Sequence, residues 1–106
     1  MKARPDAQAA ADPSEPAIGI IWSARSERDL AGIRVYIGRF APLAAQRFAL
    51  RLVGTVESLA AHPKRGRVVR GEVRELVVVA PDIVRYRITA QAVEVIRIRH
   101  GAQRPD

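Results

Sequence analysis

Apolar residues recur at helical spacing in the first half of the chain. Between residues 24 and 40 they step by three and four, at Leu30, Ile33, Ile37 and Phe40. This spacing predicts an amphipathic helix over 24–40, and Ser23 is a suitable N-cap in front of it. A short apolar run at 18–22, rich in strand-forming residues, predicts a first strand before that helix.

A second helix is predicted after Pro42, a residue that suits the first turn of a helix. Its apolar residues again step by three and four, at Ala45, Phe48, Leu52, Val56 and Leu59. The residue before a proline is disfavoured in the α region, so His62-Pro63 should end this helix. The segment 64–67 that follows is predicted to be a basic turn.

The second half of the chain has the patterns of strands. Residues 73–79 are mostly β-branched, residues 83–88 alternate between apolar and charged, and another strand is predicted over 93–100. Strands and helices are therefore segregated along the chain, which predicts an α+β fold. We expect an N-terminal strand and a two-helix antiparallel hairpin, packed on an antiparallel sheet with a C-terminal three-stranded meander.

Residues 1–17 have a different composition from the rest. They contain three prolines and no Leu, Val, Ile or Phe, so they can bury almost nothing to offset the entropy of ordering. We expect a disordered N-terminal arm over 1–17 and one folded domain over 18–104.

The last two predicted strands each have one charged face, which carries Arg85 and Arg87 in one strand and Arg97 and Arg99 in the other. A three-residue hairpin loop, 90–92, brings these four arginines together as one basic patch, and we favour it because the apolar faces then coincide. A two-residue loop instead places Arg87 opposite Glu94 as a cross-strand ion pair. Without a binding role, the patch is a solvated outer face of the sheet.

Charge points to an acidic partner. The 106 residues include 18 basic and 11 acidic side chains, a formal net charge of +7, and only Lys2 and Lys64 among the basic ones are lysines. Arginine favours forked recognition of carboxylate or phosphate, although a GC-rich genome produces the same bias. There is no cysteine, and the two histidines have no metal-ligand spacing, so we expect no metal and no cofactor. No run reaches the roughly 20 apolar residues of a membrane span, and no secretory signal is evident.

His100, at the end of the last predicted strand, is the better of the two histidines as a functional candidate. The simpler alternative is a strand-end histidine bonded to backbone, and we weigh it above a role in proton transfer. Asp29, in the first helix, is expected to be a helix-surface charge or the ion-pair partner of an arginine.

These residues together resemble the ParE branch of the RelE/ParE toxin superfamily over about residues 18–104. The resemblance is carried by Trp22-Ser23, Asp29-Leu30, Ile33, Tyr36-Ile37, Pro42, Ala44-Ala45, Phe48, Leu59, Pro63, Gly66-Arg67, Arg74-Glu75-Leu76, Tyr86-Arg87-Ile88 and Arg97-Ile98-Arg99-His100-Gly101. It implies a bacterial, cytoplasmic type II toxin that is neutralised by a ParD-like ribbon-helix-helix antitoxin. Operator DNA would be bound only through that antitoxin.

The resemblance also implies two modes of action, because ParE relatives poison DNA gyrase whereas RelE relatives cut messenger RNA in the ribosome. The RelE branch uses an arginine at the place of Arg74, a tyrosine followed by an arginine where Asp82-Ile83 stand, and commonly a tyrosine near the C-terminus. Only Arg74 matches here, although Arg85 lies on the same strand face as Ile83 and could stand in for the second arginine. ParE members usually carry a tyrosine at Asp82 as well.

The expected function is therefore a non-enzymatic gyrase inhibitor. The alternatives are a ribosome-dependent mRNA endonuclease, or a degenerate, non-toxic protein kept as an antitoxin-binding corepressor. We take seven basic residues as candidates for binding the antitoxin or the target: Arg74, Arg85, Arg87, Arg97, Arg99, His100 and Arg104.

Overall fold

The computed structural model describes residues 18–79 and 82–101. The chain runs through β1 (Gly19–Trp22), α2 (Ala24–Gly38), α3 (Pro42–Glu57), the short 3-10 helices η1 (Ser58–Ala60) and η2 (Pro63–Arg65), β2 (Arg67–Arg70), β3 (Val73–Val79), β4 (Asp82–Ile88) and β5 (Ala92–Arg99). The predicted N-terminal arm lies outside the described residues.

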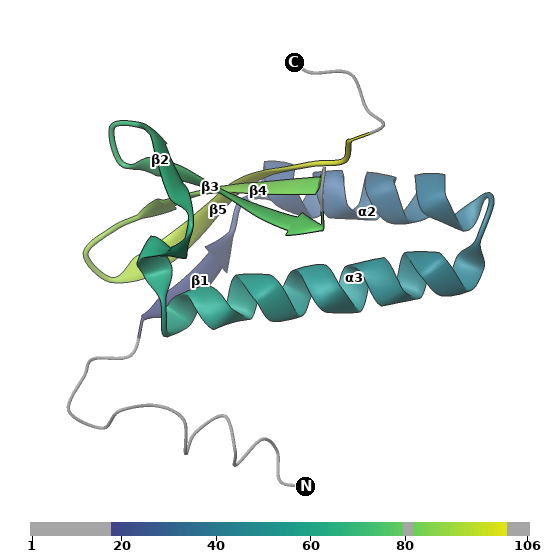
Figure 1. Cartoon of the computed structure of the whole chain (residues 1–106), viewed down its shortest axis with the longest axis horizontal. Helices are drawn as coiled ribbons and strands as arrows, with labels where there is room; N and C mark the ends of the chain where they lie inside the picture. Colours follow the sequence, from purple (N-terminus) through teal and green to yellow (C-terminus); the bar gives the residue numbers. More distant parts are fainter. Residues whose placement is uncertain (1–17, 80–81, 102–106) are drawn as a thin grey trace, which may run out of the picture.

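The elements form two layers, with α2 and α3 as an antiparallel hairpin on one face of a five-stranded sheet (Figure 1). The strand order is β1-β5-β4-β3-β2. The predicted α+β fold is confirmed, including the helical hairpin and the C-terminal meander β3-β4-β5. The sheet is mixed rather than wholly antiparallel, because β1 pairs with β5 in parallel.

Strand β2 was not expected from the sequence, which predicted a basic turn over 64–67 and no strand directly after it. It pairs antiparallel with β3 at the edge of the sheet, and all four of its residues are exposed. A strand that buries nothing has no apolar alternation, so the pattern gives no signal for it. The turn into β3 contains Gly71 at φ 53°, a conformation that glycine adopts without the steric cost of a Cβ.

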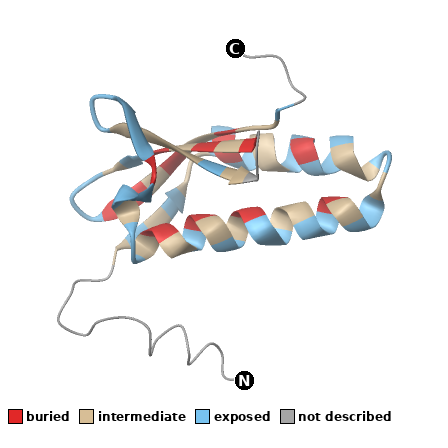
Figure 2. Ribbon diagram, viewed as in Figure 1, coloured by how far each residue is buried: buried red, intermediate tan, exposed pale blue. Residues whose placement is uncertain are grey.

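The core lies between the hairpin and the sheet (Figure 2). Its fully buried members are Ile33, Leu52, Val56, Leu59, Val84, Tyr86, Val93, Val95 and Ile98. The predicted stripes of both helices are confirmed except at one position: Phe40 is 76% exposed. It is exposed because α2 ends at Gly38, so Phe40 belongs to the turn between the helices.

Ser23 is the N-cap of α2, as predicted. Its hydroxyl accepts a hydrogen bond from the Ser26 backbone N–H (3.0 Å) and donates one to the Ile96 carbonyl of β5 (3.0 Å). One side chain therefore both begins the helix and fixes it against the central sheet.

The Tyr86 hydroxyl anchors the connection between α3 and β2 from inside the core. It donates to the Pro63 carbonyl (2.7 Å) and accepts from the Gly66 N–H (2.8 Å). Residue 66 must be glycine, because a Cβ there would meet the Glu75 carbonyl oxygen and the Tyr86 hydroxyl, both at 2.7 Å. The buried tyrosine and the small residue therefore depend on each other.

Leu52 is fully buried in the middle of α3. We expect Leu52→Ala to lower the free energy of unfolding by about 2–5 kcal/mol, since it removes buried methyl groups and leaves a cavity. Denaturant unfolding measures the loss, and Leu50→Ala, at a position that is 74% exposed on the same helix, is the control. An equal, small shift for both variants would contradict the position of α3 in this fold.

Candidate functional site

The hairpin between β4 and β5 has the shorter of the two loops considered from the sequence. The Thr89 N–H donates to the Ala92 carbonyl (2.8 Å), so only Ala90 and Gln91 form the loop. Arg87 therefore lies opposite Glu94 and forms an ion pair with it at 2.7 Å. The favoured three-residue loop is wrong.

The apolar side chains of β4 and β5 nevertheless lie on the same side of the sheet along both strands, because β5 contains a bulge. Tyr86 pairs with Val95 and Arg85 pairs with Arg97, so Ile96 is an extra residue on β5. One extra residue reverses the alternation beyond it. Near the loop Val93 and Val95 are buried, and after the bulge Ile98 is buried as well.

The predicted patch of four arginines is largely neutralised by carboxylates. Arg85 donates two hydrogen bonds to Glu75 of β3 (2.6 and 2.9 Å), Arg87 binds Glu94, and Arg97 approaches Asp29 of α2 at 3.3 Å. Arg85 and Arg97 are neighbours in the ladder, as predicted. Of the four, only Arg99 has no ion pair among the described residues. The face is therefore a network of paired charges rather than a free basic patch.

Arg74 lies on the opposite face of the sheet from Arg85. It pairs with Tyr86 in the ladder, and Tyr86 points into the core, whereas Arg85 alternates with it and points away. The Arg74 guanidinium donates to the carbonyls of Gly66 (2.7 Å) and Lys64 (3.4 Å). Arg74 thus holds the η2–β2 connection from the same face of the sheet as Tyr86, at a less buried position.

His100 is bound to Asp82 at the other end of the core-facing side. Its Nδ1 lies 2.7 Å from Asp82 Oδ1, and the Gly101 N–H donates to the same oxygen (3.1 Å). The imidazole meets the rings of Tyr36 and Phe48 edge-on, at centroid distances of 5.7 and 6.1 Å. Asp82, which departs from the tyrosine usual in the resembling families, therefore orders the end of β5.

These groups do not converge on one reaction centre. Asp82 and Tyr86 are four residues apart on β4, so the His100 pair lies roughly 13 Å along the strand from the level of Arg74. Arg85 lies on the far side of the sheet from both. Arg104 is outside the described residues, and among the described residues no three His, Cys, Asp or Glu side chains are grouped to hold a metal ion.

Asp29 has a larger role than the sequence suggested. The predicted ion pairing is present, with Arg25 and Arg97 each at 3.3 Å. In addition, its Oδ2 accepts the backbone N–H of Ile98 (2.9 Å), where β1 has ended and β5 lacks a neighbouring strand. The spacing of charges along α2 carries no signal for this contact, because its partner is 69 residues away.

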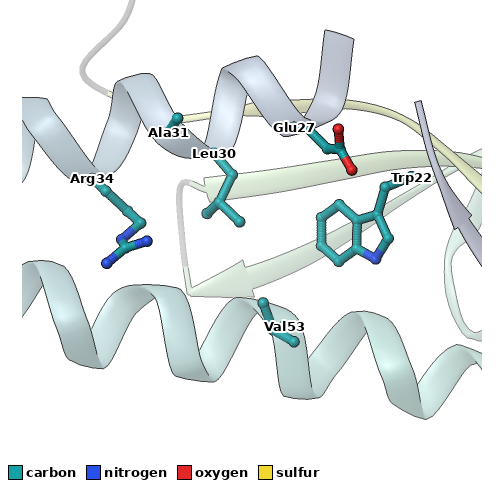
Figure 3. A pocket seen from close by; sticks show the side chains of 6 residues that line it. All are labelled: Trp22, Glu27, Leu30, Ala31, Arg34 and Val53. Carbon is teal, nitrogen blue, oxygen red and sulfur yellow. The ribbon is translucent and has the colours of Figure 1, made fainter. Parts of the chain in front are cut away.

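A groove runs between α2 and α3. One part, of about 330 Å³, is lined by Trp22, Glu27, Leu30, Ala31, Arg34 and Val53 (Figure 3). A second part, of about 340 Å³, shares Ala31 and Arg34 and continues along Val35, Pro42, Ala45 and Gln46. Leu30, Trp22 and Val53 lie between the two helices, so the groove is apolar at its centre with charged groups along α2. Sequence reasoning named none of these residues as a site.

Comparison with known proteins decides the family. The profile of the family described as "ParE toxin of type II toxin-antitoxin system, parDE" matches residues 20–105. The chain belongs to this toxin family. It is therefore the toxin of a type II toxin–antitoxin system, and the resemblance stated from the sequence is confirmed.

Curated relatives of this ParE-family toxin include one that carries a RelE name. Toxin RelE2 of Caulobacter vibrioides is 50% identical over 84 residues, covering 79% of this chain and 96% of that protein. Putative toxin Y4kP of Sinorhizobium fredii is 38% identical, covering 79% and 88%. The chromosomal ParDE system of P. aeruginosa has a chain of the same fold, with a TM-score of 0.69 at 22% identity, covering 77% of this chain and 94% of that one. In the part that the structure describes, no helix is long and apolar enough to cross a membrane.

Asp29 offers a direct test of the contact between α2 and β5. We expect Asp29→Ala to lower the free energy of unfolding by about 1–3 kcal/mol, because the partly buried Ile98 N–H loses its acceptor. Amide hydrogen exchange at Ile98 should accelerate as well. Glu57→Ala, at an exposed acid on α3, is the control and should change stability by no more than about 0.5 kcal/mol. Unchanged exchange at Ile98 would show that Asp29 does not protect this edge.

Proposed function

We propose that this toxin arrests growth by binding a protein target, DNA gyrase, and not by cutting messenger RNA. The observation that carries the proposal is the placement of Arg74 and Arg85 on opposite faces of the sheet. Cleavage of a phosphodiester needs several groups around one phosphate, positioned to within a fraction of a residue spacing. Arg85 therefore cannot replace the missing arginine of the nuclease branch beside Arg74.

The hydrogen bonds of these arginines support the same conclusion. Arg74 is occupied by two backbone carbonyls and Arg85 by the Glu75 carboxylate. Turning either guanidinium as a whole toward a developing phosphorane would cost these contacts. The membership in the ParE family agrees with a target other than messenger RNA.

Ribosome-dependent RNA cleavage is the second candidate, and one observation favours it. Asp82 orients the His100 imidazole through Nδ1, which is the arrangement of a general acid or base. The name of the 50% identical relative, Toxin RelE2, points to the same branch. A non-toxic corepressor is the third candidate, because Asp82 departs from the tyrosine that the resembling families usually carry.

Purified toxin separates the three candidates. We expect it to inhibit gyrase supercoiling and to accumulate cleaved DNA, while message in a translating extract stays intact. Arg74→Ala should keep most of this activity per folded molecule, with circular dichroism reporting the folded fraction, because Arg74 serves the fold. Arg28→Ala, at an exposed helix position, is the control.

Two other results would replace the proposal. Codon-specific mRNA cuts that disappear in Arg74→Ala, with gyrase unaffected, indicate the endonuclease; loss of one transition-state donor typically costs about 10²–10³ in rate. No activity in either assay, together with retained antitoxin binding, indicates the corepressor.

We further propose that the antitoxin docks in the groove between α2 and α3. The groove is apolar at its centre, and the stretch from residue 30 to 56 contains four arginines and no acidic residue. An acidic segment with an apolar stripe complements such a surface, and folding of that segment on the toxin would bury the stripe.

Ala31 lines both parts of the groove and is itself exposed, so a larger side chain there fills the groove without entering the core. Ala31→Arg should weaken antitoxin binding at least about tenfold, which equals about 1.4 kcal/mol. Ala61→Arg is the matched control, an exposed alanine past α3 that receives the same side chain and charge. Titration calorimetry with the antitoxin measures both, and equal affinities would place the antitoxin elsewhere.

A further inference from the structure

Strand β2 leaves one edge of the sheet without a partner strand. It is the last strand in the order β1-β5-β4-β3-β2, and all of Arg67–Arg70 is exposed. An edge strand presents backbone N–H and C=O groups that can pair with another extended chain. The short strand β1 forms the opposite edge, and next to it the second half of β5 is contacted by Ser23 and Asp29.

A bulge gives this edge an unusual arrangement of charge. Val68 pairs with Arg74 and Arg70 with Val73, so Val69 is an extra residue on β2. Arg67 and Arg70 are three residues apart and would lie on opposite faces of a regular strand. With the extra residue, both lie on the face of the sheet turned away from the helices, together with Glu75 and Val73.

Both arginines remain available to a partner. Arg67 is 78% exposed in its side chain and reaches Glu75 only at 3.9 Å. Arg70 has no ion pair within the described residues. On the other side of the strand Val68 is 52% exposed, so the edge offers two cations on one face and an uncovered valine on the other.

We propose that β2 accepts an extended acidic segment of a partner protein as a sixth strand. The segment would carry acidic residues at alternate positions, facing Arg67 and Arg70, and apolar residues between them, on the side of Val68. Directly opposed side chains of opposite charge stabilise a strand pair, and like charges destabilise it. A second copy of the toxin is therefore a poor occupant, because antiparallel pairing of two β2 strands brings arginines of the two copies together.

This surface is separate from the groove between α2 and α3 and does not depend on the identity of the toxin's target. If no peptide pairs with β2, the result of the gyrase assay is unaffected. If the toxin does not inhibit gyrase, the result of the peptide-binding assay is likewise unaffected.

The probe is a fluorescein-labelled peptide with glutamate and valine at alternate positions, added to the full-length toxin. We expect binding by fluorescence anisotropy, and slower amide exchange within 67–70. A peptide with lysine in place of glutamate should not bind. A third peptide, with N-methylated amides on one edge, keeps the charge but cannot complete the hydrogen bonds of a strand pair, and it should bind at least about tenfold more weakly.

Arg70→Glu should weaken the acidic peptide about fivefold or more, because it replaces an attraction with a repulsion. Arg28→Glu, at an exposed helix position, makes the same change in net charge and should leave affinity within about twofold. The double variant Arg67→Glu with Arg70→Glu should reverse the preference, so that the lysine peptide binds better. Circular dichroism confirms that each variant is folded.

Three results would overturn the proposal. Absence of binding would mean that the arginines only protect the edge from unwanted pairing. Equal binding of the N-methylated peptide, or an equal loss in Arg28→Glu, would mean general attraction by a basic protein without strand pairing.

Discussion

One extra residue in β5, Ile96, allows a two-residue turn to join β4 and β5 while both strands keep apolar side chains on the core-facing side of the sheet. The two-residue loop after Thr89 fixes the pairing of β4 and β5 from that end, and in a regular ladder it would turn Arg97 and Arg99 toward the helices. Burying two guanidinium groups in the apolar core would be costly. The bulge at Ile96 removes the conflict, and the contacts of Ser23 and Asp29 with β5 are then made beside it.

Carboxylates on neighbouring elements explain why so many arginines can lie on a small sheet without a free basic surface. Glu75 lies between Arg67 and Arg85, Glu94 opposes Arg87, and Asp29 approaches from the helix layer. Among these pairs, the more exposed one of Arg87 with Glu94 contributes little to stability, usually less than about 1 kcal/mol. Their main effect is on the distribution of charge: the cations left for a partner lie at the edge of the sheet and on the helices.

The spacing of apolar residues along the sequence predicts which side chains of the helices and strands face the core. Leu52 and Ile33 face the core as their spacing requires, and Tyr86 points inward as alternation requires. Two features carry no such signal. Strand β2 buries nothing, and a bulge such as that at Ile96 changes the face of later residues without changing their order. The pairing of His100 with Asp82 joins residues 18 positions apart, so it too needed the three-dimensional fold.

The parallel pairing of β1 with β5 has a consequence for the synthesis of the toxin. Gly19 lies beside Ala92, so β1 has no strand to pair with until nearly all of the described chain has been synthesised. Until then Ile20 and Trp22, which pack against the core, belong to a strand without a neighbour, and pairings this distant in sequence form slowly. Ribosomes that stop before β5 therefore release fragments that cannot build the native sheet, and the cell is exposed to a folded toxin only when β5 has been made.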